Sequence, residues 1–130
     1  MKVLALDFGS ARTGVAVSDP TGTLARPLGV VQRAADAGLD ELVALIREEA
    51  PERVVVGLPL TLRGEVGEQA RATEQFVAVL RGRVQVPVET FDERFTTTLA
   101  ARSPAAAAPE DARAAAHLLS SWLEWRSTRP

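Results

Sequence analysis

The sequence contains no cysteine and a single lysine, and its apolar runs are short. Without cysteine the chain forms no disulfide bond and offers no thiolate ligand to zinc. No stretch approaches the ~18 consecutive apolar residues of a membrane-spanning helix, and the apolar run after Met1 and Lys2 is too short for a signal peptide. We therefore expect a soluble, cytoplasmic protein with no membrane partner.

The formal net charge is -2, which excludes a protein that holds nucleic acid by bulk positive charge alone. Local basic patches remain open. Lys2 is the sole lysine among the 15 basic residues, and the rest are arginine. We attribute this excess to coding bias, because the chain is also rich in alanine, and we draw no function from it.

The chain has 130 residues, of which 46% are hydrophobic, so residues 1–130 are predicted to form a single domain with one core. Apolar runs bounded by turn signals predict strands, and apolar residues at helical spacing predict helices. The expected strands cover residues 3–6, 13–18, 24–31, 54–57 and 84–90, and the expected helices cover 39–50, 66–80 and a last helix from 109 onward, with a short helix after the fifth strand and a loop at 103–109. The order βββαβαβα predicts an α/β fold with a mixed five-stranded sheet flanked by helices.

Acidic residues stand at three places that this fold can bring together. Asp7 closes the first buried strand, Asp92 and Glu93 follow the fifth strand, and Asp111 heads the apolar stripe of the last helix. Convergent carboxylates repel unless they are neutralised, and hard divalent cations such as Mg²⁺ or Mn²⁺ are the usual partners. The pattern predicts hydrolysis of phosphodiester bonds with two metal ions.

Each acid also has a purely structural interpretation. Asp7 could form a turn, and Asp111 could complement the dipole of its helix. Asp92 and Glu93 are adjacent, so one of them could cap a helix while the other binds metal. We favour Glu93 as the ligand and keep Asp92 as a further candidate.

Arginines near these acids are candidates for contact with the phosphate backbone of a nucleic acid. Arg12, Arg63 and Arg94 lie in expected loops or beside the acids, and Gly64 could let a phosphate approach closely. Each arginine could equally be solvated or ion-paired. His117 is left out of the predicted site, because a lone histidine on a long helix is more often packed or solvated than catalytic.

Four motifs, in order along nearly the whole chain, resemble those of the YqgF/RuvX family. They are Leu6-Asp7-Phe8-Gly9 with the run Thr13 to Asp19, Val56-Gly57-Leu58-Pro59-Leu60 with Gly64 and Gly67, and Asp92-Glu93-Arg94-Phe95-Thr96-Thr97. The resemblance implies the ribonuclease H-like fold. It also implies a nuclease that matures the 5′ end of pre-16S ribosomal RNA, or alternatively a Holliday junction resolvase, and it places Asp7, Glu93 and Asp111 in metal-binding roles. The stretch from Thr98 to Glu110 departs from the family, because it is short and alanine-rich.

Three hypotheses follow. The first is a Mg²⁺- or Mn²⁺-dependent endonuclease acting on structured RNA or branched DNA. The second is a non-catalytic nucleic-acid-binding module with the same fold. The third, an actin-like ATPase, ranks last because such enzymes bind nucleotide between two domains and this chain has one. A homodimer remains open, since a resolvase that cuts a two-fold junction needs one and an RNA-trimming nuclease does not.

Overall fold

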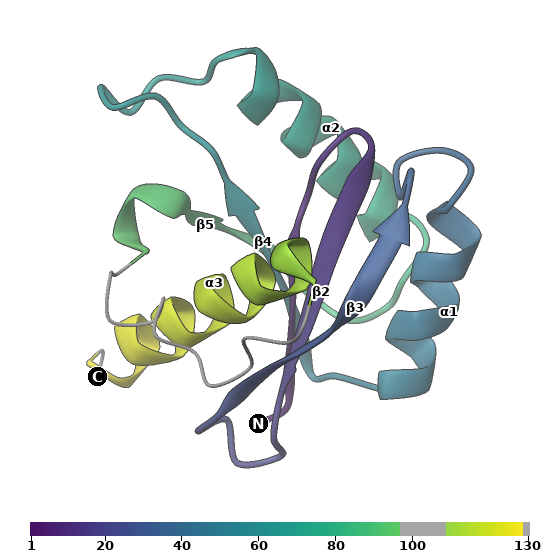
Figure 1. Cartoon of the computed structure of the whole chain (residues 1–130), viewed down its shortest axis with the longest axis vertical. Helices are drawn as coiled ribbons and strands as arrows, with labels where there is room; N and C mark the ends of the chain where they lie inside the picture. The colour runs from purple at the N-terminus through teal and green to yellow at the C-terminus, as the bar shows by residue number, and fades with distance from the viewer. Residues whose placement is uncertain (97–108, 129–130) are drawn as a thin grey trace.

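The computed structural model describes residues 1–96 and 109–128, and it shows a sheet with helices on both faces (Figure 1). The elements are β1 (Val3–Asp7), β2 (Arg12–Ser18), β3 (Ala25–Gln32), α1 (Leu39–Glu49), β4 (Arg53–Leu58), α2 (Glu68–Arg81), β5 (Val88–Asp92), the 3₁₀ helix η1 (Glu93–Phe95) and α3 (Glu110–Ser127). The strand order is β3-β2-β1-β4-β5. β1 pairs antiparallel with β2 and parallel with β4, and β5 runs parallel to β4. The predicted mixed five-stranded sheet is confirmed.

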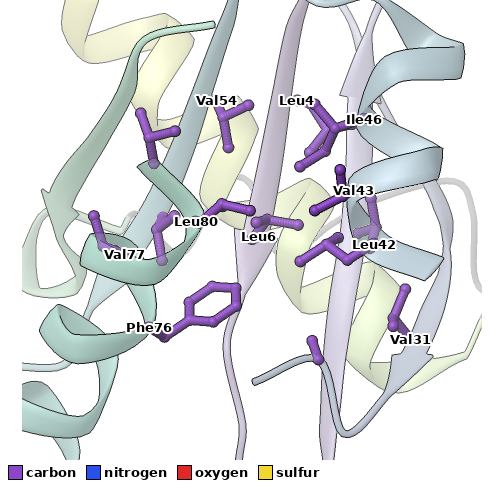
Figure 2. Packing of buried hydrophobic residues seen from close by; sticks show 14 residues of the cluster. Leu4, Leu6, Val31, Leu42, Val43, Ile46, Val54, Phe76, Val77 and Leu80 are labelled. Atoms are coloured by element: carbon purple, nitrogen blue, oxygen red, sulfur yellow. The ribbon is translucent and has the colours of Figure 1, made fainter. Parts of the chain in front are cut away.

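Side-chain alternation in β1 sorts its residues between two apolar layers. Leu4 and Leu6 pack with residues of α1 and α2 on one face, and Val3 and Ala5 pack with α3 on the other. Figure 2 shows the first layer, in which the side chain of Leu6, from β1, lies between the side chains of α2 and those of α1. Because every second side chain shares a face, Asp7 continues the row of Val3 and Ala5 toward α3.

The structure differs from the sequence prediction most clearly at the starts of α2 and β5. Helix α2 begins at Glu68, so Val66 lies in the preceding loop and is 43% exposed instead of buried in the helix. Strand β5 begins only at Val88, because Pro87 has no N–H group to donate to a ladder. The carbonyl of Pro87 still accepts a hydrogen bond from the amide of Val54. β5 is an edge strand, as expected for a strand next to proline.

The loop expected at residues 103–109 lies almost entirely outside the described residues, as does most of the family departure from Thr98 onward. In the described part of the chain, no helix combines the length and hydropathy needed to cross a membrane.

Candidate active site

Asp7 is the last residue of the central strand β1. It pairs with Gly14 of β2, and on the other side the β1–β4 ladder runs to the pair Leu6 and Val56, one residue earlier. The side chain is half-buried. Because Asp7 pairs with β2 and directly follows the last residue of β1 that pairs with β4, its backbone is fixed by the sheet and not by a flexible loop.

Glu93 is the first residue of η1, and its carboxyl group shares a hydrogen bond with that of Asp7. Burial, the charge of Asp7 and the hydrogen bond to it together raise the pKa of Glu93 to about 7, and burial is the largest of these causes. Burial also raises the pKa of Asp7, although the hydrogen bond from Glu93 opposes this rise. Two carboxyl groups can share a hydrogen bond only when one of them is protonated, so the pair holds one proton, and the raised pKa of Glu93 favours Glu93 as its carrier.

Asp111 lies close to this pair but faces an arginine. It stands in the first turn of α3, and its charge contributes to the raised pKa of Asp7. Its Oδ2 atom is 3.1 Å from Nε of Arg12, in an ion pair whose two side chains are 35% and 61% exposed, respectively. Arg12, a predicted phosphate contact, is thus paired with Asp111, a predicted metal ligand.

Asp92 forms the cap of η1 and holds Arg94. Its Oδ1 atom accepts a hydrogen bond of 2.9 Å from the backbone amide of Arg94, and its carboxylate accepts further bonds from the guanidinium. These contacts with Arg94 hold the pKa of Asp92 below its usual range. Of the two alternatives for the adjacent acids, Asp92 takes the capping geometry and Glu93 takes the position beside Asp7.

Arg94 also reaches the loop between β4 and α2. Its Nη1 atom lies 3.5 Å from the carbonyl oxygen of Leu62, and its guanidinium packs against Gly64, whose φ of +81° favours glycine. Arg63 is exposed in the same loop. The structure therefore brings the β4–α2 loop and η1 together. Of the three predicted arginines, Arg12 and Arg94 form ion pairs within the described residues and Arg63 does not.

A cavity of about 300 Å³ opens beside the carboxyl pair. It is lined by Asp7, Glu93, Thr96, Ala114, His117 and Leu118. Sequence reasoning missed Thr96 and His117. A helical projection from Asp111 could have found His117. Ala114 and Leu118 lie three and seven residues beyond Asp111 and share its face of the helix, and His117 lies next to that face. A cavity of about 350 Å³ near Arg47 and Arg83 has no carboxylate in its lining and is not the candidate.

The Asp7–Glu93 pair fits a hard divalent cation. Mg²⁺ is usually held by one or two carboxylates together with substrate phosphates and water, and it would take the place of the shared proton. Among residues 1–96 and 109–128, no three or more Asp, Glu, His or Cys side chains are grouped so as to hold a metal ion. Asp92 and Asp111 face arginines, and metal roles for these two acids, as for Asp7 and Glu93, stay predictions.

The metal-free protein is expected to lose stability as the pH rises from 4.5 to about 7. The pKa of Glu93 is about 7 in the folded protein and has its ordinary value of 4.5 in the unfolded chain, so the stability that its proton contributes is fully present below pH 4.5 and is lost as the pH rises through about 7. Discounted for solvent screening, the loss is about 1–2 kcal/mol. Urea unfolding in EDTA at several pH values measures it. Glu93→Gln is expected to flatten this dependence, and an unchanged slope in that variant would contradict the assignment.

The element order and the mixed five-stranded sheet are those of an α/β fold of the ribonuclease H-like class. A sequence model of the RuvX family, described as "Holliday junction resolvase", matches residues 1–125, and the chain belongs to this family. It is therefore a member of a family of nucleases, as the motifs predicted.

Curated relatives agree with the family assignment, and solved structures agree with the fold. A protein of Roseiflexus sp. (strain RS-1) named "Putative pre-16S rRNA nuclease" is 44% identical over 78% of this chain and 72% of its own length. A protein of the same name from Rubrobacter xylanophilus is 54% identical over 74% of this chain and 68% of its own. Thermus thermophilus RuvC in complex with a Holliday junction substrate matches with a TM-score of 0.69 and 19% identity, covering 98% of this chain and 96% of that one. At this identity the likeness shows the fold alone.

Proposed function

We propose that this chain is a metal-dependent endonuclease that matures the 5′ end of pre-16S ribosomal RNA. The observation that carries the proposal is the hydrogen-bonded pair of Asp7 and Glu93 in a cavity of about 300 Å³. The names of its relatives support ribosomal RNA as the substrate. Ribosome assembly takes place in the cytoplasm, which is where the proposal places the protein.

Asp7 and Glu93 are the proposed Mg²⁺ or Mn²⁺ ligands, and Asp111 is the proposed third. When bound, such an ion acts as a Lewis acid on a phosphoryl oxygen and lowers the pKa of a bound water. The chain itself positions the two carboxylates rigidly, because one ends the central strand and the other begins the 3₁₀ turn after β5. Asp111 is 3.1 Å from Arg12, so its participation requires this exposed ion pair to open. Such a pair is weak, which makes the opening inexpensive.

Substrate phosphates are the proposed partners of Arg12, Arg63 and Arg94, with Gly64 next to Arg63 in the chain and against Arg94 in the fold. Arg63 is exposed at the tip of the loop between β4 and α2. Arg94 fixes this loop against η1 by its contacts with Asp92 and Leu62. In this proposal Arg63 contacts the backbone directly, while Arg94 holds the loop and presents its remaining donors.

The test is a side-by-side cleavage assay on end-labelled structured single-stranded RNA and a mobile four-way DNA junction, with Mg²⁺, Mn²⁺ or EDTA. The expected result is metal-dependent cutting of the RNA that EDTA abolishes. Cutting that persists at full rate in EDTA would contradict the proposal.

Arg63→Gln is expected to weaken RNA binding and to lower its salt dependence, because one phosphate contact is lost.

The second candidate function is Holliday junction resolution, which the description of the family model favours. A resolvase places paired nicks across a two-fold symmetric junction and so needs a symmetric dimer. Paired nicks in the DNA junction, together with a dimer in sedimentation, would select this candidate. Saturable binding to either substrate without cutting in any metal would instead select a non-catalytic binding module.

A further inference from the structure

Gly57 lies in β4, beside the carboxyl pair of Asp7 and Glu93. Val56 pairs with Leu6 in the parallel ladder, so Gly57, the next residue of β4, is level with Asp7, the next residue of β1. On its other side Gly57 pairs with Phe91 of β5. The residue is buried. By the alternation of β4, it belongs to the same face of the sheet as Val55, which packs against α3. Gly57 therefore lies between the strand that carries Asp7 and the strand that leads into Glu93, on the face where both carboxyl groups meet.

The space that a side chain at position 57 would need is filled by Glu93. A Cβ atom built on Gly57 would lie 2.6 Å from Oε1 of Glu93 and 3.1 Å from its Cγ. Non-bonded carbon and oxygen atoms do not approach so closely, so Glu93 would have to move away. Cδ2 of Leu118 would also lie 3.1 Å from this Cβ atom, so Leu118 fills the space on one side of it. Leu118 lines the same cavity as Asp7 and Glu93.

We infer that Gly57 is a positioning residue for Glu93: its missing side chain creates the room in which the Glu93 carboxyl group reaches Asp7. This inference rests on the proposed function for its consequence, which is metal binding by the pair. The closest atom is the flexible end of a side chain, so a methyl group at position 57 displaces the carboxyl group without forcing the backbone to move. The substitution is therefore expected to damage the site much more than the fold.

The first experiment compares Gly57→Ala with Gly29→Ala. Gly29 is a glycine of β3 whose added Cβ would meet no atom within 4 Å, so it controls for the change in backbone freedom. Mn²⁺ affinity is measured by calorimetry without nucleic acid. Gly57→Ala is expected to weaken it by about 10- to 100-fold, the range for residues that orient a metal ligand, while Gly29→Ala leaves it unchanged. Both variants are expected to keep a urea midpoint near that of the wild type.

A double-mutant cycle tests whether the effect passes through Glu93. Glu93→Asp shortens the side chain and removes the atom at 2.6 Å. It weakens Mn²⁺ binding by itself, but adding Gly57→Ala to it is expected to cost much less than in the wild type. Equal losses in the two backgrounds would overturn the inference, because the two positions would then act independently.

Metal-free crystal structures give a readout that needs neither metal nor activity. In Gly57→Ala the hydrogen bond between Glu93 and Asp7 is expected to be absent, and its retention would overturn the inference. If wild-type protein binds Mn²⁺ but cuts no nucleic acid, the proposed function fails while the affinity and crystal readouts still decide the role of Gly57. If Gly57→Ala does not fold, recovery of folding by adding Glu93→Ala supports the inference, and failure to recover overturns it.

Discussion

Asp7→Asn is expected to lower metal-dependent cleavage at least about 1000-fold. The substitution removes one of the two carboxylates proposed to hold the cation, whose stabilisation of the transition state amounts to several kcal/mol, and each 1.4 kcal/mol is a factor of ten in rate. The fold is expected to remain, because the amide oxygen of asparagine can still accept the hydrogen bond that Glu93 donates. Initial rates on labelled RNA in Mg²⁺ measure the effect.

Two companion variants make this result specific. Glu93→Gln is expected to show a loss of similar size, and Glu48→Gln, at an exposed position of α1, is expected to cut at the wild-type rate. Circular dichroism and urea unfolding confirm that the variants are folded. Cleavage by Asp7→Asn at the wild-type rate would remove the carboxyl pair from the mechanism.

Gly14→Ala is expected to lower the free energy of unfolding by about 2–3 kcal/mol. A Cβ atom on Gly14 would lie 1.8 Å from the carbonyl oxygen of Asp111 and 2.4 Å from its carbonyl carbon. Both are backbone atoms, which no change of rotamer can move. The start of α3 would have to lift away from β2, and it carries Asp111, Ala114 and His117 with it, so activity is expected to fall as well.

Urea unfolding of Gly14→Ala beside Gly29→Ala measures this effect. Alanine is expected at position 29 to leave stability unchanged or to raise it by about 0.5–1 kcal/mol, because its unfolded chain has less freedom than that of glycine. The difference between the variants reports the close contact of α3. Equal stability of the two would show that α3 tolerates a side chain beneath its first turn.

Much of the fold could be predicted from the sequence because the relevant signals are local. The apolar run after Lys2, the turn after Ser18 and the helical spacing from Leu39 each concern residues close in the chain, and the structure confirms the elements they predict. Boundaries were less accurate. Val66 continued the helical spacing of α2 but lies before it, because spacing does not show where a helix begins.

The candidate site was only partly predictable. The position of Asp7 follows from a carboxylate at the end of a buried strand, and the sequence favours Glu93 over Asp92 as the ligand. The sequence offers the ion pairs of Arg12 with Asp111 and of Arg94 with Asp92 only as one alternative among several. Ion pairing depends on distances across the fold, and a sequence pattern contains no such distances.

The kind and order of the elements, the family and the acids available for chemistry can be derived from the chain alone. These follow from periodicity, turn residues and motifs, which are properties of short stretches. The folded chain is needed to show that Glu93 meets Asp7, that His117 lines their cavity, and that Gly57 leaves the room for this contact. These contacts depend on packing, because β1, β4, β5 and α3 meet at one place and the space that remains there depends on all four at once.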